Sequence, residues 1–157
     1  MNTTTAIVLP LLIGVIAGLR AMTAPAAISL AARVGPLDLS TTSLAFLGYA
    51  YTPWIFTALA LVELVTDQLP STPSRTVPSQ FGTRILVGGL TGGAIGASGG
   101  ALVTGAVAGV VGAVIGTLGG RAVRARLAAA LGSDRPAAII EDLIAIGGAF
   151  LIVKALP

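Results

Sequence analysis

Long apolar runs dominate this sequence, and short polar segments separate them. The first run covers residues 4–34, and the polar linker "GPLDLSTTS" follows it. The apolar residues are continuous and do not alternate with a period of two, so the runs predict α-helices rather than the strands of a membrane barrel. As one helix the first run would be about 46 Å long, which exceeds a membrane core of about 30 Å. We therefore expect this helix to break near Thr23-Ala24-Pro25, with Pro25 as the cause.

The second apolar run covers residues 53–70. Three aromatic side chains cluster at its start, as they do at membrane interfaces: Tyr49, Tyr51 and Trp54. A polar, proline-rich loop follows over residues 70–84.

The third run, residues 85–120, is rich in glycine and long enough for two helices. Ser98-Gly99-Gly100 is the one plausible turn within it. Glycines recur four residues apart, as at Gly88, Gly92 and Gly96, and this spacing lets helix backbones approach closely in lipid. A basic connector over residues 121–135 leads to the last run, residues 136–157. The pattern predicts five membrane spans, or four if the turn at Ser98 is absent.

The composition favours an all-α membrane protein with one transmembrane domain over residues 1–157. Of the 157 residues, 55% are hydrophobic and 10% are charged, whereas soluble domains carry roughly 25% charged residues. The chain has no cysteine and no histidine, so it lacks a thiolate nucleophile, soft metal ligands and the commonest general base. We therefore expect no soluble-type enzyme, no metal and no cofactor.

The net charge of +3 comes from arginines that lie mostly between the apolar runs. Arginine-rich loops are typical of the cytoplasmic side of membrane proteins, and this interpretation is favoured over nucleic-acid binding. The loop with Arg75 and Arg84 and the connector 121–135 are then inside, and the linker at Asp38 is outside. With five spans, the N-terminus is inside and the C-terminus is outside.

Two halves of the chain resemble each other. The sequence "GLRA" at residues 18–21 matches "GGRA" at residues 119–122. The matches suggest repeats over residues 4–69 and 101–155, although alanine-rich sequences also match by chance. Since five spans would orient the halves in opposite directions, we expect an inverted repeat of spans 1–2 and 4–5, as in many transporters.

Arg20 lies inside the first apolar run, close to the expected break. A charge in a membrane helix is costly and needs a partner. Glu63 is the best candidate, with Asp67 one helical turn further on. The free amides at a half-helix start favour an anion, and Thr23 adds a hydroxyl. These residues predict a substrate site, and the alternative is a structural Arg20–Glu63 pair that locks two helices.

Hydroxyl groups surround an arginine where Ser74, Arg75 and Thr76 follow one another. This group can hold a phosphate or a lipid head group at the cytoplasmic interface. The alternative is a capped, proline-rich turn. Glu63 and Asp67, one turn apart, also suit Mg²⁺, although lipid transferases of that kind usually carry more acidic residues than this chain.

Glu141 and Asp142 lie in the last run, beside the basic connector. Adjacent helical residues point about 100° apart, so we expect the two carboxylates to face different partners. Glu141 is predicted to form an ion pair with Arg121 or with Arg124.

Three segments together resemble a family of small bacterial integral membrane proteins known as a domain of unknown function. They are "GLRAMTAPAA" (18–27), "ELVTDQLPSTPSRT" (63–76) and residues 119–153. The resemblance covers nearly the whole chain. It implies a bacterial inner-membrane protein, and it implies no activity and no catalytic residue.

The leading hypothesis is a small transporter or channel for an anionic or zwitterionic solute, with Arg20, Thr23 and Glu63 lining its site. One alternative is a protein that binds or modifies lipid head groups through residues 67–76, and another is a non-catalytic membrane scaffold. Because a chain this small encloses little volume, we expect a homodimer.

Overall fold

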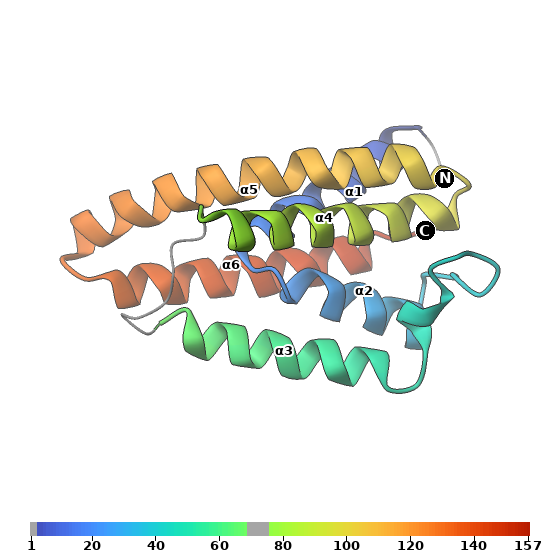
Figure 1. Cartoon of the computed structure of the whole chain (residues 1–157), viewed down its shortest axis with the longest axis horizontal. Coiled ribbons are helices and arrows are strands. Elements are labelled where there is room, and N and C mark those ends of the chain that lie inside the picture. The colour runs from blue at the N-terminus through green and yellow to red at the C-terminus, as the bar shows by residue number, and fades with distance from the viewer. Residues whose placement is uncertain (1–2, 69–75) are drawn as a thin grey trace.

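The computed structural model describes residues 3–68 and 76–157, which form a bundle of α-helices (Figure 1). As the sequence predicts, these residues include no strand. The elements in chain order are α1 (Thr3–Leu19), α2 (Thr23–Val34), the short 3₁₀ helix η1 (Ala45–Gly48), α3 (Thr52–Thr66), α4 (Pro78–Ser98), α5 (Leu102–Leu131) and α6 (Asp134–Lys154).

The first apolar run breaks one turn earlier than expected. Residues 20–22 separate the two helices, and Pro25 lies inside the first turn of α2. Proline has no N–H to donate to the residue four positions before it, and its ring crowds the preceding turn. The helix therefore ends before Ala21, whereas proline is well tolerated in the first turn of the helix that follows.

The two halves of this run form a helical hairpin rather than a kinked span. Ile16 of α1 lies beside Gly148 of α6, and Arg20 lies beside Asp142, so α1 and α6 are antiparallel. Figure 1 shows α2 running back beside α6, toward the end of the bundle where the N-terminus lies. The hairpin tip, residues 20–22, is therefore inside the bundle.

Helix α5 is the centre of the packing, and glycines allow its close contacts. A β-carbon on Gly105 or Gly109 would overlap the backbone of α4, and one on Gly112 or Gly116 would overlap the backbone of α1. The turn between α4 and α5 lies where the sequence predicts it, and Gly100 there has a φ of +75°, which favours glycine. The glycine pattern thus reflects helix packing, as expected.

The prediction of five membrane spans is wrong in its count. Within the described chain, only α5 and α6 are both long enough and apolar enough to cross a membrane. The break shortens α1 to 17 residues, and α3 has 15. The connector that was expected at residues 121–135 is largely helical, because α5 continues to Leu131 and ends at Gly132, which has a φ of +69°.

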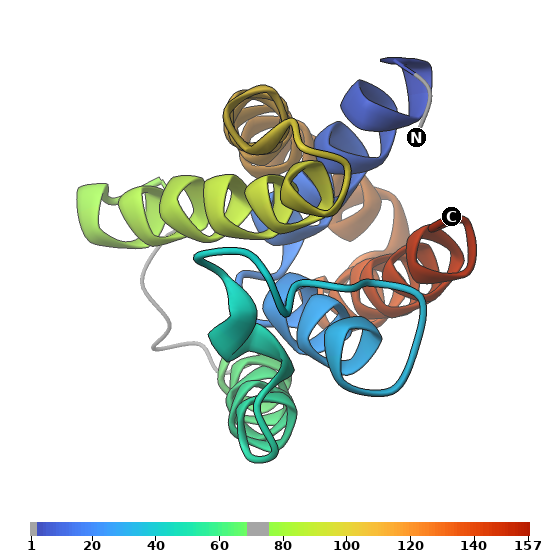
Figure 2. The same cartoon turned by 90° about the vertical axis from the view of Figure 1, so that its right-hand side faces the viewer.

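Both termini lie at the same end of the bundle (Figures 1 and 2). The α1–α2 hairpin turns the chain back toward this end. The directions of α1 and α5 are incompatible with the expected inverted repeat. Gly14 contacts Gly109 and Gly18 contacts Gly116, so α1 and α5 run in the same direction. Moreover, α5 is continuous where α1 breaks.

Candidate charged site at the hairpin tip

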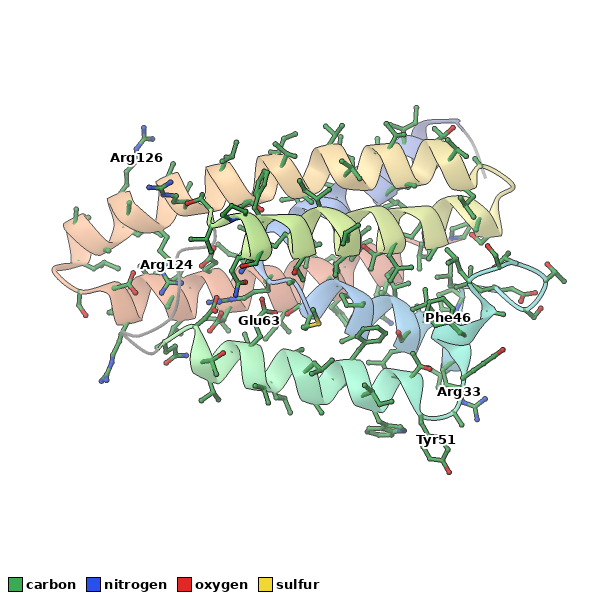
Figure 3. The ribbon with its side chains drawn as sticks, in the orientation of Figure 1. Arg33, Phe46, Tyr51, Glu63, Arg124 and Arg126 are labelled. Atoms are coloured by element: carbon green, nitrogen blue, oxygen red, sulfur yellow. The ribbon has the colours of Figure 1, made fainter. Side chains whose placement is uncertain are left out.

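Charged side chains from four helices, α3 to α6, gather around Arg20 at the tip of the α1–α2 hairpin. Figure 3 shows two of them, Glu63 and Arg124, at the same end of the bundle. We call this group the charged cluster, and its members are Arg20, Glu63, Asp67, Arg84, Arg124, Asp134, Glu141 and Asp142.

Arg20 is completely buried and binds carboxylates of two helices. Its Nη1 donates to Asp67 of α3, and its Nη2 lies 2.6 Å from Asp142 Oδ1 and 3.7 Å from Glu141 Oε2 of α6. The prediction that Arg20 pairs with Glu63 is wrong. The second candidate, Asp67, does bind Arg20. The sequence also predicts different partners for Glu141 and Asp142, and this prediction is wrong. Both reach Arg20 because one guanidinium nitrogen lies between them.

Glu63 does not bind Arg20 because its carboxylate caps helix α2. Its Oε1 accepts a hydrogen bond from the amide of Ala21, and its Oε2 accepts one from the amide of Met22, both at 2.7 Å. A helix start carries unpaired amides and partial positive charge, and the thioether of Met22 is too weak an acceptor to serve them. The sequence predicts a solute anion at this helix start, whereas the structure has a carboxylate of the protein itself there.

Arg84 binds the other side of the break. Its Nη1 donates to the carbonyl oxygens of Gly18 and Leu19, at 2.9 and 2.8 Å, and its Nη2 lies 3.6 Å from Glu63 Oε1. The side chain is 2% exposed, although the sequence analysis placed it in a loop. The missed signal is Pro78, which begins α4, since proline is favoured in the first turn of a helix.

Glu141 pairs with Arg124, the second of its two predicted partners, and not with Arg121. Arg124 lies 3.3 Å from Glu141 and also binds Asp134 at 2.6 Å and the carbonyl of Asp67. Arg121 instead donates to Thr76 Oγ1 at 3.3 Å. Arg124 is one turn closer than Arg121 to the start of α6, where both acids lie.

The remaining predicted residues lie in different places. Thr23 is in the first turn of α2 and is 7% exposed. In the described part of the chain, its Oγ1 has no hydrogen-bond partner. Thr76 binds Arg121, whereas Ser74 and Arg75 lie outside the described residues. The phosphate or lipid site predicted there therefore stays a prediction.

A magnesium site at Glu63 and Asp67 does not fit the contacts. Glu63 binds two backbone amides, and Asp67 binds Arg20. Over residues 3–68 and 76–157, no group of three or more acidic side chains is arranged to hold a metal ion.

The hairpin tip is thus a preformed carboxylate site. Two convergent amides and the Arg84 guanidinium surround one carboxylate, and hydrogen bonds from such groups to an anion are among the strongest in proteins. Another carboxylate can take the same place only if the Glu63 side chain leaves it.

Comparison of the chain with protein-family models, with curated proteins and with solved structures finds no match. These comparisons do not test the resemblance to the bacterial membrane family, which stays a prediction.

Proposed function

We propose that this protein is a small membrane transporter for an anionic solute, and that the solute binds at the hairpin tip in place of Glu63. The observation that carries the proposal is the pair of 2.7 Å hydrogen bonds from the Ala21 and Met22 amides to the Glu63 carboxylate. Transporters commonly bind anionic groups at the start of a broken helix. In this interpretation, Glu63 occupies the site while the solute is absent.

A membrane location is supported by the apolar surface of the bundle. Beyond the two helices that are long and apolar enough to span, large apolar side chains point outward from several helices, among them Trp54, Val65, Leu86, Val107, Leu143 and Leu151. A soluble protein rarely exposes so much contiguous apolar surface, so we infer that lipid covers it. The family resemblance implies the bacterial inner membrane.

The fold also changes the orientation that the arginines favour. Arg124 and Arg126 lie at the end of the bundle opposite the two termini (Figures 1 and 3). By the positive-inside rule this end faces the cytoplasm. We therefore propose that both termini and the linker at Asp38 lie outside, in place of the predicted inside N-terminus.

Helix α3 is the element whose small movements would withdraw Glu63 from the site. It lies at the edge of the bundle in both views and packs mainly against α2 and η1 (Figures 1 and 2). Glu63 and Asp67 join its C-terminal part to the hairpin tip and to Arg20. A solute carboxylate that replaces Glu63 removes one of these two attachments, so solute binding and movement of α3 are coupled.

Uptake by purified protein in liposomes tests the proposal. The probes are radiolabelled acetate, lactate and succinate, with protein-free liposomes as the blank for passive leakage. We expect uptake of at least one probe, and a KM several-fold lower in Glu63→Gln, because the tethered competitor loses its charge. Glu141→Gln is the matched control, since Glu141 belongs to the same cluster but binds no backbone amide of the tip. Absence of uptake for all three probes would contradict transport.

The lipid-handling and scaffold hypotheses, and the homodimer, stay predictions. Ser74 and Arg75, which carry the lipid hypothesis, lie outside the described residues.

A further inference from the structure

A cavity of about 360 Å³ lies between α2, α3 and α6. Each helix contributes four lining residues at helical spacing, and all are apolar except Thr23 and Thr57. Because two hydroxyls offer little to a hydrated solute, the cavity suits a hydrocarbon chain. At roughly 30 Å³ for a group the size of water, it has room for on the order of ten methylene groups.

One end of the cavity, at Thr23 and Leu64, is next to the carboxylate site along both helices. Thr23 lines it and directly follows Met22, whose amide binds Glu63. Leu64 also lines it and directly follows Glu63. Thr23, at this end of the cavity, is 7% exposed, and its buried hydroxyl has no hydrogen-bond partner in the described part of the chain. An unpaired buried hydroxyl is costly, and a ligand oxygen at the end of the cavity would satisfy it.

We infer that the solute is an amphipathic monocarboxylate, with its carboxylate at the Ala21 and Met22 amides and its alkyl chain in the α2–α3–α6 cavity. The inference deepens the proposed function and rests on it. The Thr23 hydroxyl donates to the solute carboxylate, next to the two amides. A carboxylate is the anion of choice because the present occupant of the site is one.

The alkyl chain of the solute enters the cavity from the lipid side of the bundle. Leu61 and Phe150 line the cavity and are 59% and 60% exposed, so the cavity opens on the apolar surface. An acyl chain of a phospholipid is the competing occupant, and it is distinguished below.

Binding of acetate and octanoate to the full-length protein in lipid nanodiscs tests the inference. Ala27 lines the cavity, and Ala27→Trp fills it. Ala58→Trp is the matched control, because Ala58 is exposed on α3 and does not line the cavity. Each methylene buried from water favours binding roughly four-fold. The ratio of octanoate to acetate affinity in Ala27→Trp, relative to the control, is therefore expected to fall at least ten-fold, with acetate affinity unchanged. Partitioning of octanoate into lipid cancels in this comparison.

The other outcomes overturn distinct claims. If both variants keep the wild-type ratio while acetate still binds, the cavity does not hold the chain, and the proposed function survives. If mass spectrometry finds a retained phospholipid that only Ala27→Trp loses, and the ratio is unchanged, a lipid tail occupies the cavity instead. If neither carboxylate binds, to the wild type or to Glu63→Gln, the proposed function itself fails.

Discussion

Arg20 is fully buried at the point where the chain reverses direction, and its partners come from α3 and α6. A buried ion pair adds little to stability as a whole, but removing one partner leaves unpaired charges, which costs about 3–5 kcal/mol. Arg20 therefore holds three helices together even though burying it is itself unfavourable.

Replacing Arg20 with methionine is expected to lower the free energy of unfolding by about 3–5 kcal/mol, because Asp67 and Asp142 lose their shared cation. Thermal unfolding in detergent measures the change. Arg126→Met is the control, since Arg126 is exposed, and it should change stability little. Equal stability of the two variants would show that Arg20 is not paired as described.

Asp38, in the linker between α2 and η1, is a second, smaller electrostatic feature. The amide and then the hydroxyl of Ser40 donate to its carboxylate at 2.9 and 2.7 Å, and they hold the pKa of Asp38 below its ordinary value. Because the folded pKa is the lower one, this contribution to stability is present above the unfolded pKa and is lost as pH falls through the folded pKa. Ser40→Ala should raise the Asp38 pKa in an NMR titration, and Thr42→Val should leave it unchanged. A pKa that is the same in both variants would rule out a contribution from the Ser40 hydroxyl.

At the scale of elements, the sequence predicts the helix break and the close packing at the glycines. It does not predict the path that the chain takes after the break. Pro25 correctly predicts that the first run is interrupted, but a proline does not determine whether the chain kinks or reverses. That choice depends on Glu63 and Arg84, which satisfy the backbone groups on the two sides of the break. Both lie far from the break in sequence, so local pattern carries no information about them.

Gly109 and Gly119 of α5 give a matched pair of substitutions with opposite expected effects. A β-carbon on Gly109 would overlap the backbone of Gly88, whereas one on Gly119 meets nothing within 4 Å. Gly109→Ala should separate α4 from α5 and lower the thermal midpoint strongly. Gly119→Ala should raise stability by up to about 1 kcal/mol, the usual helix preference for alanine. Thermal unfolding in detergent compares them, and destabilisation by both would contradict the packing.

At the scale of the whole molecule, α2 returns along the bundle instead of continuing the path of α1. Both termini therefore lie at one end of the bundle (Figures 1 and 2). The composition correctly predicts an all-α protein, and the charged residues of the site come from segments that the sequence analysis had singled out. The sequence does not determine how these residues pair. Arg20 has acidic neighbours from both α3 and α6, and the packing of those helices determines which of them it binds.

Epitope tags at the two termini test this arrangement. In sealed vesicles, both tags should be accessible from the same side, and a cysteine introduced by Arg126→Cys should react with an impermeant reagent from the opposite side. Tags on opposite sides would restore the five-span topology and contradict the hairpin.

The central claim is that the hairpin tip is a solute site, and accessibility of Thr23 tests it most directly. The chain has no native cysteine, so Thr23→Cys can be treated with a membrane-impermeant maleimide from each side in turn, with Asp38→Cys as the exposed control. Because Thr23 is buried while Glu63 occupies the tip, labelling requires the tip to open. We predict slow labelling from at least one side, and slower labelling with saturating octanoate. No labelling from either side, while Asp38→Cys reacts, would mean that the tip is permanently packed and that the charged cluster only holds the helices together.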